Sequence, residues 1–244
     1  MFTWKEEDKV KEDKDKGRFL NTVLILCLFG LVLFLYMDIF LTYERLEGSS
    51  LKTKVFGATY MTMNNQFYYV LNYEIRTFVE DNGDRLITLD PALDQKKQNE
   101  EIEQLIERNV DAIFLNPVDW MSVEPALQSA KKAGIPVIVV DTPVYDNKLV
   151  ACTIVSDNYN AGVQCAVHMM NLKSKADIVL IIHPNAKSAQ ERIQGFLNSI
   201  EGKPEYRVVA KEDGKGQIER TFPKMQKLLE EGINFDVILM ETWL

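Results

Sequence analysis

Short apolar runs alternate with helix-like segments from residue 55 to residue 240, and this alternation restricts the fold more than any other feature of the sequence. The runs AIFL at 112–115 and PVIVV at 136–140 have no charged side chain, and a helix-like segment lies between them. Near-continuous apolar strands of this kind are typical of parallel sheets that are covered by helices on both faces. The sequence therefore predicts an α/β fold with open, Rossmann-like parallel sheets.

The expected elements fall into two sets that meet near residues 145–152, which predicts a first lobe over 55–150 and a second lobe over 151–244. Strands are expected at 55–60, 86–89, 112–115, 136–140, 152–155, 178–182, 206–210 and 235–240. Helices are expected at 66–81, 96–109, 123–133, 159–171, 188–200 and 217–231. No helix-like segment follows the last strand, so we expect the second lobe to be partial and that strand to lie at an exposed or partner-covered edge.

The N-terminal region contains an apolar run without a charged residue, at 19–37. A helix of about 20 apolar residues can cross a bilayer. Lys and Arg are frequent before the run and sparse after it, which predicts a cytoplasmic N-terminus. We expect a cytoplasmic tail over 1–18, a transmembrane signal anchor over 19–43 and a linker over 44–54. A cleaved signal peptide is the alternative, but its apolar region is usually shorter and a small-residue cleavage site follows it closely.

Polar side chains recur where the expected strands end, and the first of these positions also carries two aromatic residues. In open parallel sheets, ligands bind beyond the carboxyl ends of the strands. Amide groups and aromatic faces together suit a ligand with many hydroxyls and an apolar ring face. Helix caps and turns before proline are the structural alternative for each of these positions. The residues are Asn65, Phe67, Tyr68, Asn116, Asp141, Ser156, Asp157 and Asn158, with His183 as a further strand-end residue at the expected pocket rim.

Five motifs follow the strand ends in order: MNNQFYY, FLNPVDW, IPVIVVDTP, IVSDNYNAG and SAQERIQGF. With these motifs the chain, from about residue 54 to residue 243, resembles the type I periplasmic sugar-binding proteins, the ribose-binding-like solute receptors of ABC transporters. The resemblance implies that a pyranose or furanose sugar binds between the lobes, with aromatic rings against the sugar and polar side chains on its hydroxyls.

The resemblance also assigns ligand-binding positions in the second lobe. Arg192 falls on an arginine that commonly precedes Gly-Phe by three residues, and Gln190 stands where the ribose receptors have their pocket arginine. The segment 240–243, Met-Glu-Thr-Trp, departs from the Asn-Asp pair that is usual in the family, so ribose itself is not the expected sugar. The full set of implied ligand-binding residues is Asn65, Phe67, Tyr68, Asn116, Asp141, Ser156, Asp157, Asn158, Gln190 and Arg192.

Other functional classes have little support in the sequence. It contains no nucleophile elbow, no glycine-rich phosphate loop and no metal-ligand spacing, so we expect no enzyme activity, cofactor or metal. DNA regulators share this fold, but the chain has no helix-turn-helix before residue 55 and a formal net charge of −8, which argue against nucleic acid as a partner. The expected partners are a small-molecule sugar, the membrane, and an ABC permease or a sensor histidine kinase. A surface enzyme and a truncated fragment that binds nothing are the alternatives.

Overall fold

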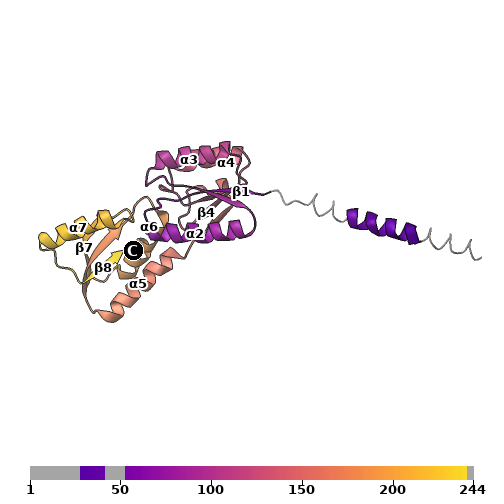
Figure 1. The fold of residues 1–244 in the computed structure, drawn as a ribbon. Helices are drawn as coiled ribbons and strands as arrows, with labels where there is room; N and C mark the ends of the chain where they lie inside the picture. The colour runs from indigo at the N-terminus through magenta and orange to yellow at the C-terminus, as the bar shows by residue number, and fades with distance from the viewer. Residues whose placement is uncertain (1–27, 42–52, 241–244) are drawn as a thin grey trace, which may run out of the picture. The chain divides into compact units, whose positions relative to one another are not determined.

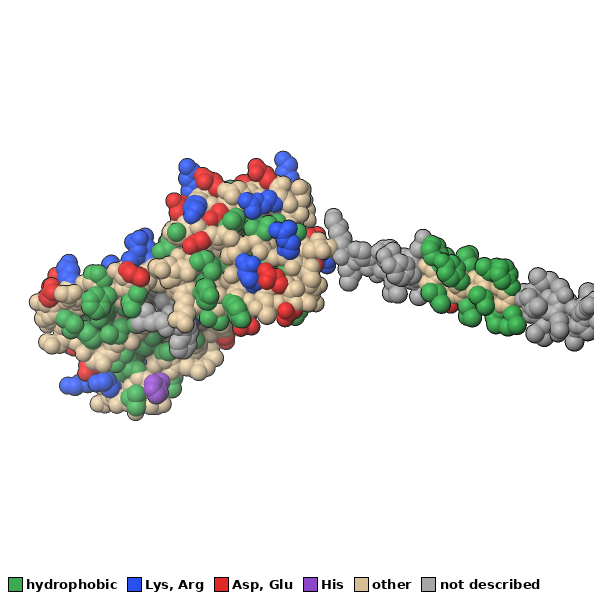
Figure 2. Space-filling model, viewed as in Figure 1, with side chains coloured by type: hydrophobic (Ala, Val, Ile, Leu, Met, Phe, Trp, Pro, Cys, Tyr) green, Lys and Arg blue, Asp and Glu red, His purple; other side chains and the backbone are tan. Residues whose placement is uncertain are grey.

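The computed structural model describes residues 28–41 and 53–240, which belong to two separate compact units. Residues 28–41 form a helix whose large apolar side chains are exposed along its whole length (Figure 2). Within the described ranges no helix is both long and apolar enough to cross a membrane. Much of the expected anchor, including residues 19–27, lies outside these ranges, as do residues 1–18 and 42–52.

The first lobe is built on a five-stranded parallel sheet with the strand order β2-β1-β3-β4-β5. Its strands are β1 (Val55–Thr59), β2 (Arg85–Leu89), β3 (Ala112–Leu115), β4 (Val137–Val140) and β5 (Cys152–Ile154). Each neighbouring pair is parallel, and the register brings Thr59 opposite both Leu89 and Leu115. The carboxyl ends of β1, β2 and β3 are therefore level with one another at one edge of the sheet.

Helices cover both faces of this sheet because its inner strands are apolar on both faces. Helices α3 (Gln95–Glu107) and α4 (Glu124–Lys132) pack on one face, where Ile113 and Val139 are fully buried. Helix α2 (Gln66–Asp81) packs on the opposite face, together with Ala58 and Val140 (Figure 1). Successive strand residues point to opposite faces, so one apolar run can serve both cores.

Strand β5 corrects one expectation from the sequence. The run at 152–155 was expected to open the second lobe, but Cys152–Ile154 pairs in parallel with β4 and completes the first sheet. Only the short 3-10 turn η1 (Asn147–Leu149) lies between these two strands. The chain thus leaves the first sheet after residue 154, just before the polar segment that begins at Ser156.

The second lobe contains a three-stranded parallel sheet with the order β7-β6-β8. Its elements are α5 (Asn158–Leu172), β6 (Ala176–Ile182), α6 (Lys187–Ile200), β7 (Tyr206–Asp213), α7 (Ile218–Glu230) and β8 (Val237–Met240). Helices α5 and α6 pack on one face of the sheet and α7 packs on the other. The two parallel sheets confirm the predicted α/β fold class.

Strand β8 lies at an edge of its sheet, which agrees with the position expected for the run at 235–240. Strand β7 forms the other edge and is longer than the sequence suggested, because it continues through Lys211, Glu212 and Asp213. A run of charged residues argues against a buried strand and suggests a loop, but such residues are common on exposed edge strands.

Candidate ligand-binding site

A cavity lies between the carboxyl ends of the two sheets, and both lobes line it. Most of its polar residues lie in the loops that follow β1, β4, β5, β6 and β7, and Ser188 and Arg192 come from helix α6. The lining residues are Met61, Asn65, Phe67, Tyr68, Asp141, Ser156, His183, Ala186, Ser188, Ala189, Arg192, Lys215, Gly216 and Gln217. This is the edge at which open parallel sheets bind ligands.

The structure brings most of the sequence-predicted site residues to this cavity. Those that line it are Asn65, Phe67, Tyr68, Asp141, Ser156 and Arg192. Those that do not line it are Asn116, Asp157, Asn158 and Gln190.

The aromatic wall of the cavity comes from the first turn of α2. Tyr68 is almost fully buried and Phe67 is 41% exposed, with the two ring centroids 5.2 Å apart in an edge-on arrangement. The buried ring of Tyr60 stacks behind Tyr68 at 6.4 Å. Burial, with the nearby Asp141 carboxylate, raises the pKa of Tyr68, so its hydroxyl is protonated at neutral pH. The wall is therefore an aromatic surface that the buried Tyr60 ring supports from the core side.

Asn65 serves both the helix and the cavity. Its Oδ1 accepts a hydrogen bond from the Phe67 amide at 2.9 Å, so it is the N-cap of α2. Its Nδ2 donates to the carbonyl of Gly216 in the second lobe at 3.2 Å. Asn65 therefore caps the helix, which was the structural alternative for this position, and its side chain also joins the two lobes.

Asp141 is the carboxylate of the cavity, and its backbone lies in the left-handed region with φ 68°. Such a conformation is uncommon for a residue other than glycine and is often found at functional sites. Its Oδ2 accepts hydrogen bonds from Asn116 Nδ2 and Thr142 Oγ1, both at 3.2 Å. Burial raises the pKa of this carboxyl, while Thr142, Arg192 and Asn116 act in the opposite direction.

Asn116 lies behind Asp141 and is fully buried. Its Nδ2 also donates to the Val140 carbonyl at 3.1 Å, and its Oδ1 accepts from the Met61 amide at 3.3 Å. The residue thus ties the ends of β1 and β4 together and orients Asp141.

Arg192 brings a cation to the cavity from α6, and Asn158 positions it. Arg192 Nη2 donates to Asn158 Oδ1 at 2.6 Å, and Asn158 Nδ2 in turn donates to the Ser156 carbonyl at 3.1 Å. Asp157 is the N-cap of α5, where its Oδ1 accepts from the Asn160 amide at 3.0 Å. The segment 156–158 therefore contributes Ser156 to the cavity and uses its other two side chains for support.

Gln190 is turned away from the cavity. Its Nε2 donates to the carbonyl of Pro184, and its side chain lines a separate hollow beside Leu197 and Lys211. It lies two residues before Arg192 on α6, so its side chain projects about 200° away around the helix.

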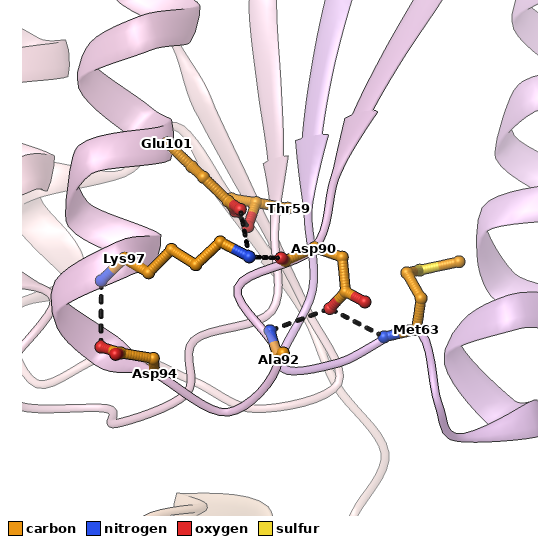
Figure 3. A network of polar contacts seen from close by, with 7 residues as sticks. All are labelled: Thr59, Met63, Asp90, Ala92, Asp94, Lys97 and Glu101. Atoms are coloured by element: carbon orange, nitrogen blue, oxygen red, sulfur yellow. Dashed lines mark hydrogen bonds and ion pairs between the residues drawn. The ribbon is translucent and has the colours of Figure 1, made fainter.

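A polar network fixes the loop that leads into the aromatic wall (Figure 3). Asp90 Oδ1 accepts from the amides of Met63 and Ala92 at 3.1 and 2.9 Å, and the Asp90 carbonyl accepts from Lys97 Nζ at 2.6 Å. Deeper in the lobe, Thr59 Oγ1 donates to the buried Glu101 carboxylate at 2.7 Å. The loop between β1 and α2 is therefore held by the end of β2.

Direct contacts join the lobes beside the cavity. The buried hydroxyls of Thr142 and Ser188 lie 2.7 Å apart, within hydrogen-bonding distance. The Trp120 amide donates to the Asn185 carbonyl at 3.3 Å, and Lys187 Nζ lies 5.2 Å from the Trp120 ring centroid. Both lobes are thus in contact around the site.

Several cavity residues were not among the predicted site residues. Lys215, Gly216 and Gln217 follow β7, and the strand-end rule would have found them had β7 been given its full length. His183 also follows a strand end; the sequence placed it at the pocket rim but not in the ligand-binding set, and the structure places it in the cavity lining. Ser188 and Ala189 begin α6 and give no signal in the sequence. Among the residues that the structure describes, no cluster of His, Cys, Asp or Glu could hold a metal ion.

Comparison with known protein sequences agrees with this geometry. The sequence pattern of the periplasmic binding protein domain family matches residues 56–242. The ribose import binding protein of Bacillus subtilis (strain 168) is 30% identical over 176 residues, which cover 71% of this chain and 57% of that protein. The galactofuranose-binding protein of Escherichia coli (strain K12) is 33% identical over 138 residues, which cover 53% of this chain and 43% of that protein. The chain thus spans about half the length of these relatives.

Solved structures show the same arrangement of elements. An ABC transporter solute-binding protein from Mycobacterium smegmatis, crystallised with bound glycerol, superposes with a TM-score of 0.72 at 26% sequence identity. The superposition covers 77% of this chain and 66% of that one.

Proposed function

Because the chain belongs to the periplasmic binding protein domain family, we propose that it is a solute receptor that binds a small monosaccharide in the cavity between its lobes. The observation that carries this proposal is the composition of the cavity wall, with an aromatic pair on one side and a carboxylate and a guanidinium within the same site. A sugar ring presents an apolar face to an aromatic side chain and hydroxyls to charged groups, which make the stronger hydrogen bonds.

The polar residues divide their roles in this proposal. Asp141 accepts hydrogen bonds from sugar hydroxyls and Arg192 donates to them, while Phe67 and Tyr68 cover the ring. Asn116 and Asn158 stay behind the cavity and hold the two charged groups. Asn65 and Ser156 contribute polar atoms at the rim.

Binding is tested by thermal unfolding of the full chain with a panel that includes D-ribose, D-galactose, L-arabinose, D-fructose and myo-inositol. A ligand that binds only the folded protein raises the midpoint. We expect at least one sugar to do so, and Asp141→Asn to weaken its binding by about 1.5–3 kcal/mol, the scale of a hydrogen bond to a charged group. The control is Asp157→Asn. Asp157 lies outside the cavity, and an asparagine retains a side-chain oxygen that can cap α5. Equal loss in both variants, or no stabilisation by any sugar, contradicts the proposal.

We also propose that the receptor is tethered to the membrane with its sugar-binding region outside the cytoplasm. The charge-free run at 19–37 and the Lys and Arg residues before it support this orientation. Protease added to intact cells should digest the region after residue 43. Protection of residues 55–240 from that protease would contradict the orientation.

The tethered receptor passes its sugar-bound state to a membrane partner, either an ABC permease or a sensor histidine kinase. A permanent helical anchor favours the sensor, because an anchored receptor stays beside its partner. Co-purification from solubilised membranes distinguishes the two: recovery of a permease supports transport, and recovery of a kinase supports sensing. A surface enzyme is the competing function, and it predicts that the bound sugar is chemically converted on incubation.

A further inference from the structure

His183 lies at the carboxyl end of β6 and lines the cavity from the second lobe. Its side chain is largely buried, at 7% exposure. The turn that follows it is fixed, because the Ala186 amide donates to the His183 carbonyl at 3.2 Å and the Asn185 carbonyl accepts from the first lobe. The backbone of His183 is thus fixed at the edge of the cavity.

The imidazole has no hydrogen-bond partner among the residues that the structure describes, although it lies among polar groups. Its ring nitrogens are not among the buried side-chain atoms without a partner in the described residues, so they keep some access to the cavity or to the neighbouring hollow that His183 also lines. A largely buried polar ring that reaches the cavity and has no protein partner is free to hydrogen-bond a ligand there. Gln190, for which the resemblance implied a second-lobe contact, already donates to Pro184 and lines only the neighbouring hollow, whereas His183 lines both that hollow and the cavity.

We infer that His183 is a ligand-contacting residue that binds a sugar hydroxyl and takes the second-lobe position that the sequence assigned to Gln190. This inference rests on the proposed sugar-binding function. A neutral imidazole has one N–H donor and one acceptor nitrogen, so it can exchange hydrogen bonds with hydroxyls, which both donate and accept.

The charged groups around the ring are consistent with a neutral imidazole. Burial lowers the pKa of His183, and Lys215 acts in the same direction. Asp213 at the end of β7 and Asp119 from the first lobe act in the opposite direction. Asp141 and Arg192 are the other charged residues that line the cavity. At neutral pH the ring therefore offers both a donor and an acceptor to the cavity.

The chain contains only two histidines, and the second provides a matched control. His168 is exposed on α5 and does not line this cavity. Isothermal titration is performed with the sugar that stabilises the full chain most in the panel above. We expect His183→Leu to weaken its binding about 10-fold or more, since 1.4 kcal/mol corresponds to a factor of 10. We expect His168→Leu to bind like the wild type.

An NMR titration separates contact with the sugar from a structural role. The imidazole Hε1 signal that is absent in His183→Leu should shift when the wild type is saturated with the sugar, and the His168 signal should stay in place. A fixed His183 signal on saturation, or unchanged affinity in a folded His183→Leu variant, overturns the inference and leaves sugar binding intact. If no sugar binds the wild type, the proposed function fails and this inference fails with it.

Discussion

The two lobes use the same strand-helix unit but differ in the width of their sheets. In the first lobe β1, β3 and β4 all have a strand on each side, whereas among the described strands of the second lobe only β6 does. Strand β6 is correspondingly buried, with Ile178, Val179, Leu180 and Ile181 each at most 1% exposed. Its two neighbours are edges, where Val208 and Ile238 are 40% and 43% exposed.

This difference indicates what stabilises each lobe. The wide sheet of the first lobe forms separate cores on its two faces. The narrow sheet of the second lobe depends more on close packing between α5 and α6, where Gly162 and Gly195 let the helix backbones approach. We therefore expect the second lobe to be less stable and more sensitive to changes at that helix contact.

The largest effect is expected for Gly162→Ala. A Cβ atom at this position would lie 1.9 Å from the Arg192 carbonyl oxygen and 2.9 Å from the Phe196 amide nitrogen, so backbone atoms would have to move. Overpacking typically costs about 1–3 kcal/mol, and a clash with backbone exceeds this range. We expect the second lobe to lose protection from hydrogen exchange while the first lobe keeps it. Val167→Ala, at an exposed site on α5, is the control, and wild-type protection in Gly162→Ala would contradict the packing argument.

Leu105→Ala tests the same comparison from the first lobe. Leu105 is fully buried on α3 and packs against Gly57 of β1. Removing a buried leucine side chain costs about 2–5 kcal/mol through lost burial and a residual cavity. Urea unfolding followed by lobe-resolved hydrogen exchange should show that the first lobe opens earlier and the second lobe is unchanged. Equal destabilisation of both lobes would mean that they unfold as one unit.

A smaller, pH-dependent effect is expected for Glu101→Gln. Burial raises the pKa of the Glu101 carboxyl above its ordinary value of 4.5, so the folded state holds the proton more tightly than the unfolded state. The stabilisation that the protonated Glu101 gives to the folded state is fully present below pH 4.5, and it is lost as the pH rises through the folded-state pKa. The variant should therefore gain stability relative to the wild type between pH 4 and pH 7, by about 1 kcal/mol or less. A relative loss over that range in urea midpoints would contradict this assignment.

The smallest effect is expected for Arg207→Ala on the edge strand β7. The guanidinium makes two 2.8 Å hydrogen bonds to the Asp177 carboxylate, but the arginine side chain is 68% exposed. Exposed ion pairs contribute about 0–1 kcal/mol. The change in urea midpoint should be small and should shrink further in high salt. A loss comparable to that of Gly162→Ala would show that this edge is structurally critical.

The sequence was sufficient to locate most helices and strands, but less so to predict which strands pair with one another. Periodicity located α2 and β3 correctly because amphipathic and apolar patterns are local. It placed β5 in the wrong sheet because pairing with β4 is a tertiary choice that a short strand does not encode. Strand-end positions pointed to Asp141 and Asn65 as site residues and to His183 as a rim residue. Which side chain of a helix faces the cavity depends on helix phase, which is why Arg192 lines the cavity and Gln190 does not.

The central claim is that one sugar contacts both lobes at once, and hydrogen exchange with and without the most stabilising sugar of the panel tests it most directly. Added sugar should slow exchange around residues 61–68 and 141–156 of the first lobe and around 183–192 and 215–217 of the second. The exposed α5 face near Val167 should not change. Slowed exchange confined to one lobe, or located away from the strand ends, would contradict the claim.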